Sequence, residues 1–125
     1  MKKIETKNAP KAIGPYSQAV KAGDFLFMSG QIPIDPTTEK LIDETIESQT
    51  KQVLNNIEAI LKSEGLSFEN IVRSEIYLKD LEDRTIVNEI YAEKFQHEIK
   101  PARQMFQVSK LPLDAKIEIT CIASY

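Results

Sequence analysis

TIESQTKQVLNNIEAILKSEGLSFENIVRSEIYLK (residues 45–79) changes its hydrophobic period at Gly65. Before Gly65 the apolar residues recur at helical spacing and form one stripe: Ile46, Val53, Leu54, Ile57, Ile60 and Leu61. After Gly65 the pattern alternates as in a strand, with Val72, Ile76 and Leu78 set against Arg73, Glu75 and Lys79. Gly65 itself stands where a helix C-cap is expected. The segment therefore predicts a helix that begins near Thr45, a turn and a strand.

Two strand-like runs precede this segment, Ser17–Ala22 and Phe25–Gly30. The dipeptide Gly23-Asp24 separates them and is a two-residue hairpin signal. IPIDPTTEK (residues 32–40) follows, and its two prolines and Asp-Pro turn predict an exposed loop.

A second helix and two further strands are expected downstream. The apolar stripe of this helix consists of Ile86, Val87, Ile90, Tyr91 and Phe95, and the helix is expected to stop near Pro101. KPARQMFQV (residues 100–108) reads as a strand with Arg103, Met105 and Gln107 on one face and Gln104, Phe106 and Val108 on the other. After the loop SKLPLDA, a last strand over Lys116–Ser124 places Ile117, Ile119, Cys121 and Ala123 on one face.

The predicted order is β-β-α-β-α-β-β, which is an α+β fold in one domain spanning residues 1–125. Its two helices can cover only one face of the sheet. Phe25–Met28 is nevertheless apolar on both faces, and Met105 and Ile122 lie on faces that their neighbours mark as polar. Large exposed apolar patches are uncommon on monomers, so we expect the uncovered face to meet another copy of the chain. The alternative is that loops cover it.

Composition places the chain among ordinary globular proteins, with 42% hydrophobic and 28% charged residues. A net charge of −3 argues against a nucleic-acid binder. The longest apolar run, Phe25–Met28, is too short to span a membrane. Residues 1–10 lack the apolar core of a secretory signal, and the single cysteine suits a reducing compartment. A cytoplasmic protein is the simplest expectation.

Several classes of chemistry have little support in the sequence. One histidine, His97, and one cysteine, Cys121, do not make the usual zinc site, and Cys121 is expected to be a small core residue. No serine lies in a G-x-S-x-G elbow, and the four glycines form no phosphate-binding loop. We therefore expect neither a metal nor a cofactor.

Three stretches remain as candidate site elements. In AIGPYSQAV, Tyr16 follows Gly-Pro in a turn that would aim its hydroxyl, although a purely structural tyrosine fits the same pattern. In FMSGQIP, Gly30 allows a close approach to the backbone or marks a bulge. Arg103 and Glu118 lie on strands, and their alternation predicts that both charges lie on the same side of the sheet. This arrangement fits either a polar pocket or an ordinary salt bridge at a sheet edge.

Taken in order, six motifs resemble those of the reactive-intermediate deaminase family, RidA (YjgF). They are NAPKAIGPYSQAV, SGQIPIDP, NIEAILKSEGLSFENIV, LKDLEDRTIVNEIY, KPARQMFQV and LPLDAKIEI. The resemblance runs from about Lys7 to Ala123. It implies a chorismate-mutase-like fold, a mixed sheet with two helices on one face, and a homotrimer with ligand pockets between subunits.

The resemblance also assigns roles to individual residues. Arg103 matches an arginine whose planar fork would grip a substrate carboxylate, and Glu118 matches an acidic residue associated with the attacking water. The implied substrate-binding positions are Tyr16, Ser29, Gly30, Gln31, Asn88 and Met105. Many relatives have cysteine where this chain has Met105; the family's contact there uses the main-chain carbonyl, which methionine also supplies.

The implied reaction is hydrolysis of reactive 2-imino or 2-enamino acids to 2-keto acids and ammonia. Examples of such substrates are 2-aminoacrylate and 2-aminocrotonate, which pyridoxal-phosphate-dependent serine and threonine dehydratases release. Holding the carboxylate, orienting one water and moving one proton meet the chemical need. Two other readings remain open: a single-strand endoribonuclease or translation inhibitor, and a non-catalytic regulatory protein that binds a keto acid.

Overall fold

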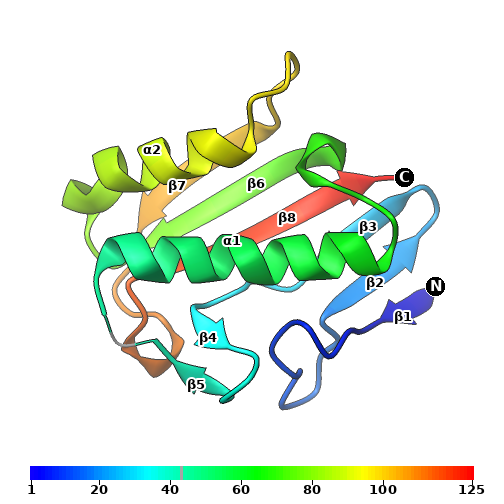
Figure 1. Cartoon of the computed structure of the whole chain (residues 1–125), viewed down its shortest axis with the longest axis horizontal. Coiled ribbons are helices and arrows are strands. Elements are labelled where there is room, and N and C mark those ends of the chain that lie inside the picture. The colour runs from blue at the N-terminus through cyan, green and yellow to red at the C-terminus, as the bar shows by residue number, and fades with distance from the viewer. Residues whose placement is uncertain (43) are drawn as a thin grey trace.

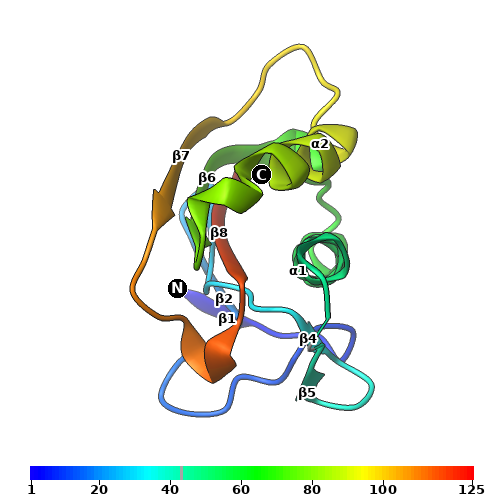
Figure 2. The same cartoon turned by 90° about the vertical axis from the view of Figure 1, so that its left-hand side faces the viewer.

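Two helices lie on one face of a six-stranded sheet in the computed structural model, which describes residues 1–42 and 44–125 (Figures 1 and 2). The helices are α1 (Ile46–Ser63) and α2 (Arg84–Lys94). The strands of the sheet, in spatial order, are β1 (Lys2–Ile4), β2 (Ala19–Ala22), β3 (Phe25–Met28), β8 (Ile117–Ser124), β6 (Ile71–Leu78) and β7 (Ala102–Gln107). This α+β arrangement confirms the predicted fold class.

The sheet is mixed. Strands β6 and β7 run parallel and are joined through α2, while every other neighbouring pair is antiparallel. A parallel connection needs a crossover, and the helix between the two strands provides it. Strand β7 therefore forms one edge of the sheet, next to α2, and β1 forms the other (Figure 1).

Local signals set the ends of α1 as the sequence predicts. The Thr45 side chain accepts a hydrogen bond from the Ser48 N–H and caps the first turn. At the other end the backbone of Gly65 has φ +70°, and its N–H donates to the Lys62 carbonyl. Glycine adopts this left-handed conformation without the strain that a side chain would add. Gly23, with φ +58°, makes the predicted turn between β2 and β3 in the same way.

The core lies between the sheet and the helices. It includes the predicted inward residues of β8, namely Ile117, Ile119, Cys121 and Ala123, together with the apolar stripes of both helices. Neither helix of the described chain has the length and apolar character that a membrane crossing requires.

Three details of the prediction are wrong, and one strand pairing was missed. Val72 is exposed, because the pairing of β6 with β8 shifts register between Ile71 and Arg73 and turns Val72 outward. Helix α2 ends at Lys94, short of Pro101. The pairing of β1 with β2 was not predicted, and the expected loop of residues 32–40 contains a small hairpin of β4 (Ile34–Asp35) and β5 (Lys40–Leu41). Three- and two-residue strands are too short to show a hydrophobic period.

The second face of the sheet is open in the single chain, as Figure 2 shows from the side. Phe25 is 42% exposed, Phe27 is 44% exposed and Phe106 is 48% exposed, whereas Leu26 and Met28 are buried under the helices. This confirms that Phe25–Met28 is apolar on both faces. Ile122 pairs with Phe27 on the same open face. No loop of the described residues buries these phenylalanines.

Candidate functional site

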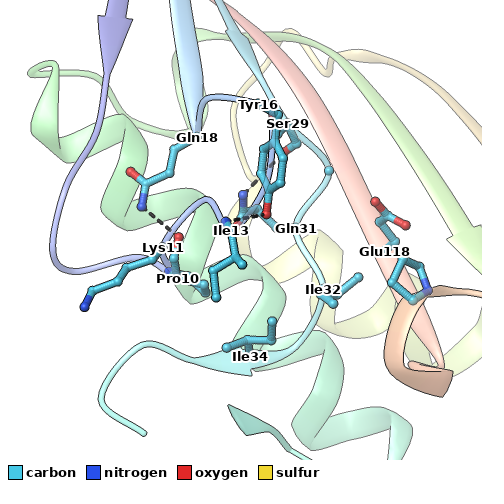
Figure 3. Close-up of a pocket in the computed structure, with 12 residues that line it drawn as sticks. Pro10, Lys11, Ile13, Tyr16, Gln18, Ser29, Gln31, Ile32, Ile34 and Glu118 are labelled. Atoms are coloured by element: carbon cyan, nitrogen blue, oxygen red, sulfur yellow. Dashed lines mark hydrogen bonds between the residues drawn. The ribbon is translucent and has the colours of Figure 1, made fainter. Parts of the chain in front are cut away.

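A cavity of about 480 Å³ lies beyond the end of β3 (Figure 3). Five of the predicted site residues line it. They are Tyr16, Ser29, Gly30 and Gln31, together with Glu118 from β8. The other lining residues are Pro10, Lys11, Ile13, Gln18, Ile32, Ile34 and Pro112. The structure therefore brings together five predicted site residues from three separate segments of the sequence.

Gly30 lies directly beside the Glu118 side chain in the wall of this cavity. A Cβ atom added to Gly30 would lie 2.9 Å from Cδ of Glu118 and would collide with its Oε1. The expectation that something approaches the backbone at Gly30 is thus confirmed, and the group that approaches is the Glu118 carboxyl. Burial raises the pKa of that carboxyl above its ordinary value.

Ser29 and Gln31 hold Gly30 in place from both sides. The Ser29 N–H donates to the Gln18 carbonyl at 2.9 Å, and its Oγ donates to the Ser17 carbonyl at 2.6 Å. The backbone of Gln31 exchanges two hydrogen bonds with Ile119 of β8, at 2.8 and 3.1 Å. These bonds continue the pairing of the two strands beyond β3, so Glu118 stays beside Gly30.

Tyr16 lies at the rim of the cavity and is 53% exposed. Its hydroxyl accepts a hydrogen bond from the Ile13 N–H at 3.3 Å, and its own N–H donates to the Gly14 carbonyl at 2.9 Å. Figure 3 shows the ring lying along the cavity with the hydroxyl directed at the turn. The hydroxyl is therefore bonded to the backbone of its own turn, which fits the structural alternative that the sequence left open.

Sequence reasoning missed Gln18, which is buried at the base of the same wall. Its side-chain amide donates to the carbonyls of Pro10 and Thr6 at 2.7 and 3.0 Å, and its Oε1 accepts from the Thr6 N–H at 2.7 Å. These bonds hold the segment that supplies Pro10 and Lys11 to the cavity. The sequence offered one signal, which is that Gln18 is a polar residue inside a predicted strand. A polar side chain that is buried in a strand needs hydrogen-bond partners, and these partners link it to other segments.

A second cavity, of about 320 Å³, lies between α2 and the start of β7 and contains Arg103. It is lined by Asn88, Tyr91, Ala92, Phe95, Lys100, Pro101 and Arg103. Nη1 of Arg103 donates to Oδ1 of Asn88 at 2.8 Å, and Cζ lies 5.0 Å from the centre of the Tyr91 ring. None of the ion pairs within residues 1–42 and 44–125 involves Arg103, so no described carboxylate neutralises its charge.

The prediction that Arg103 and Glu118 share one side of the sheet is wrong. Arg103 stands opposite Ser74 in the ladder of β6 and β7, on the face that the helices cover. Glu118 stands opposite Tyr77 in the ladder of β6 and β8, on the open face. The two charges look alike in sequence because each alternates with apolar residues. Arg103 can face the helices because β7 is an edge strand whose start opens to solvent.

Met105 shares the helix-covered face with Arg103. It stands opposite the buried Ile76, is partly buried, and packs against the core. The expectation that Met105 lies on a polar, uncovered face is therefore wrong. Its side chain fills the space between β7 and the core, and only its backbone belongs to the edge of the sheet.

The lone cysteine is part of the core, as expected. Cys121 is buried, its Sγ lies 3.7 Å from Oγ of Ser74, and burial raises the pKa of its thiol to about 12. A thiol with that pKa is not a nucleophile near neutral pH. In the described part of the chain no three side chains of the types that bind metals cluster together.

Comparison with known proteins places this chain in one family. The family model described as Endoribonuclease L-PSP matches residues 6–125. A RutC family protein of Pyrococcus horikoshii is 55% identical over 120 residues, which is 96% of this chain and 94% of that protein. The chloroplastic Reactive Intermediate Deaminase A of Arabidopsis thaliana is 49% identical over 121 residues, which is 97% of this chain and 64% of that protein.

Among solved structures, E. coli TdcF with bound serine is 40% identical and superposes with a TM-score of 0.94, covering 100% of this chain and 99% of TdcF. Because the family model and these relatives each span nearly all of the chain, the protein belongs to the Endoribonuclease L-PSP family, which is the RidA (YjgF) family whose motifs its sequence carries.

Proposed function

We propose that this protein hydrolyses reactive 2-imino and 2-enamino acids, such as 2-aminoacrylate and 2-aminocrotonate, to 2-keto acids and ammonia. The observation that carries the proposal is the Arg103 guanidinium, which lines a cavity and has no carboxylate partner among the described residues. A relative named Reactive Intermediate Deaminase A and the serine bound to TdcF, a small amino acid, support this class of substrate.

In this proposal the complete site joins the half-sites of two chains in a homotrimer. One chain supplies the cavity with Tyr16, Gly30 and Glu118, and its neighbour supplies the cavity with Asn88 and Arg103. Support comes from the placement of Arg103 and Glu118 on opposite faces of one sheet, and from the apolar open face around Phe27. Exposed apolar patches of this kind commonly mark protein interfaces.

Arg103 binds the substrate carboxylate through two parallel N–H···O bonds. Asn88 steadies the guanidinium, and the Met105 carbonyl and the backbone of Ser29, Gly30 and Gln31 line the space around the reacting carbon. Tyr16 closes the rim. The site needs no metal or organic cofactor for this reaction.

Glu118 handles the proton. Its carboxylate orients a water molecule and takes one proton as the water oxygen bonds to the imine carbon; the electron pair of the C=N bond moves to nitrogen, which receives that proton from Glu118. Glu118 then carries the hydroxyl proton to the same nitrogen, the C–N bond breaks with its electron pair leaving on ammonia, and the oxygen forms the keto group. An enamine enters the same route after one proton moves from its nitrogen to its β-carbon.

A coupled assay tests the proposal. Threonine dehydratase generates the imine in solution, and the protein should accelerate the appearance of the 2-keto acid. Arg103→Ala should abolish the acceleration, whereas Arg84→Ala, an exposed arginine at the start of α2, should not. Full activity of Arg103→Ala would remove Arg103 from the mechanism.

Mixing two inactive variants tests the shared site. Arg103→Ala and Glu118→Ala chains, unfolded and refolded together, should regain about a quarter of the wild-type activity, because about one interface in four pairs an intact Arg103 with an intact Glu118 in a cyclic assembly. If the mixed trimers regain no activity, Arg103 of one chain and Glu118 of its neighbour do not act together in a site between the two chains.

RNA cleavage, which the name of the family model mentions, has weaker support. The net charge is −3, and Lys11 is the one cationic side chain that lines the cavity with Glu118 in the described chain. Binding single-stranded RNA requires a positive groove with aromatic side chains.

We assign the protein to the cytoplasm because its single cysteine suits a reducing compartment.

A further inference from the structure

We infer that Tyr91 is a positioning residue, whose ring holds the Arg103 guanidinium in the orientation that receives the substrate carboxylate. This inference rests on the proposed role of Arg103. Tyr91 ends the motif LKDLEDRTIVNEIY, but the resemblance gives it no role, and the sequence alone identifies it only as an apolar position of the second helix.

The guanidinium is held by two residues on one face of α2. Asn88 and Tyr91 are three positions apart, and residues at this spacing are neighbours on a helix surface. Asn88 accepts a hydrogen bond from Nη1 at 2.8 Å, while the Tyr91 ring lies 5.0 Å from Cζ. The hydrogen bond fixes one nitrogen, and the ring restricts the remaining swing of the side chain. An aromatic face attracts a guanidinium by cation–π interaction.

Tyr91 is itself held in place from two sides. Its hydroxyl donates to Oγ of Ser74 at 2.9 Å, and its ring stacks on Phe95 with ring centres 4.1 Å apart. Ser74 is fully buried and stands directly opposite Arg103 in the ladder of β6 and β7. The ring therefore links the strand beneath Arg103 to the guanidinium, and it cannot rotate away without breaking a buried hydrogen bond.

This arrangement leaves the arginine ready for a ligand. A guanidinium has five N–H donors, of which Asn88 engages one and the ring face engages none. Because the ring is neutral, it orders Arg103 without cancelling its charge, as a carboxylate partner would. A side chain that is ordered before binding loses less conformational freedom when the carboxylate arrives, and the affinity rises accordingly.

If Tyr91 had a purely structural role, the loss of ligand affinity on its replacement would follow the loss of core stability. Tyr91 is only 7% exposed, so any truncation will also lower the thermal stability. Phe68 provides the matched control, because it is equally buried and packs edge-on against Phe95 at 5.2 Å, and it does not line the cavity that contains Arg103.

The experiment compares Tyr91→Leu, Tyr91→Phe and Phe68→Leu in the full-length protein, at a temperature where all are folded. Pyruvate affinity is measured by calorimetry, and the Nε–Hε resonance of Arg103 is recorded by NMR without ligand. We expect Tyr91→Leu to weaken pyruvate binding about tenfold and to shift that resonance, because the ring attraction and the ring current are lost. Tyr91→Phe should keep both near wild type with a lower melting temperature, and Phe68→Leu should change the melting temperature alone.

Wild-type pyruvate affinity in folded Tyr91→Leu, with an unmoved Arg103 resonance, would overturn the inference. A loss of affinity in Phe68→Leu equal to that in Tyr91→Leu would also overturn it, since the effect would then follow core stability. Because the resonance is recorded without ligand, it separates the two proposals. If the protein does not hydrolyse imines but the Arg103 resonance still depends on the Tyr91 ring, the proposed function is contradicted and the positioning role of Tyr91 is not.

Discussion

Arg103 and Glu118 lie on opposite faces of the same sheet. Arg103 shares the helix-covered face with Ser74, and Glu118 shares the open face with Tyr77. Each charge lines its own cavity, one between α2 and β7 and the other beyond the end of β3. A single chain therefore presents two separate cavities, and the proposed reaction needs the two cavities, contributed by different chains, to face one another.

Replacement of Arg103 by lysine tests the geometry of carboxylate binding separately from the charge. Lysine keeps the positive charge but cannot form the two parallel hydrogen bonds of a guanidinium. One charge-assisted hydrogen bond is worth about 1.5–3 kcal/mol, so we expect kcat/KM in the coupled imine assay to fall roughly 10- to 100-fold. The control Arg84→Lys should retain wild-type kcat/KM. If Arg103→Lys retains it as well, a point charge suffices at this position.

Gly30→Ala should reduce activity without unfolding the protein. The added methyl group would collide with the Glu118 carboxyl, which is the end of a flexible side chain and can move aside. We expect a small change in melting temperature and at least a tenfold loss of kcat, because displacing a catalytic group by about 1 Å has large kinetic effects.

Gly23→Ala should show the reverse pattern. No atom lies within 4 Å of the added Cβ, but the backbone has φ +58°, so the cost is about 1 kcal/mol of strain with kcat unchanged. Equal kcat for Gly30→Ala and the wild type would contradict the role given to Glu118.

The raised pKa of Glu118 predicts opposite effects of pH on activity and on stability. Only the carboxylate accepts a proton, so kcat/KM should rise with pH through a pKa above the ordinary value of 4.5. Because the folded-state pKa exceeds the unfolded one, the stability contributed by protonated Glu118 is complete below the unfolded pKa and is lost as pH rises through the folded pKa.

Glu118→Gln separates these effects, since glutamine stays neutral throughout. We expect the variant to be inactive, to match the wild-type melting temperature at acidic pH, and to exceed it at neutral pH. Thermal melts across the pH range check this. A variant that is less stable than the wild type at neutral pH would show that the charge is compensated in the assembled protein.

Phe27→Asp tests the open face as the subunit interface. Phe27 is 44% exposed in the single chain, and an aspartate there would be costly to bury between subunits. We expect light scattering to show monomers in place of trimers, with loss of imine hydrolysis and an unchanged helical signal in circular dichroism. Asn55→Asp adds the same charge on the exposed side of α1 and should remain trimeric. A trimeric Phe27→Asp protein would place the interface elsewhere.

Several parts of the fold could be predicted because their signals are local. The cap at Thr45 and the positive-φ glycine at Gly65 bound α1, and the strict alternation in Ile117–Ser124 identifies the buried face of β8. The family motifs likewise identify Gly30 and Glu118, which meet in the structure. These features depend on neighbours in the sequence or on a pattern that each strand carries by itself.

The face on which Arg103 lies could not be predicted in this way. Alternation shows that Arg103 and Phe106 point in opposite directions, but it does not show which direction the helices cover. In β7 the apolar Phe106 lies on the open face and the charged Arg103 under the edge of α2, which reverses the usual reading of apolar as inside. The β-bulge that exposes Val72 is hidden for the same reason, because it exists only in the pairing of two strands.

The sequence by itself determined the two helices, the five longer strands, their order and the residue types available for chemistry, since propensity, capping and hydrophobic period act over a few residues. Only the tertiary structure decided which of these residues meet. Strand pairing and helix packing bring Glu118 to Gly30 and place Tyr91 under Arg103, and such contacts between distant segments depend on register and on which face is covered.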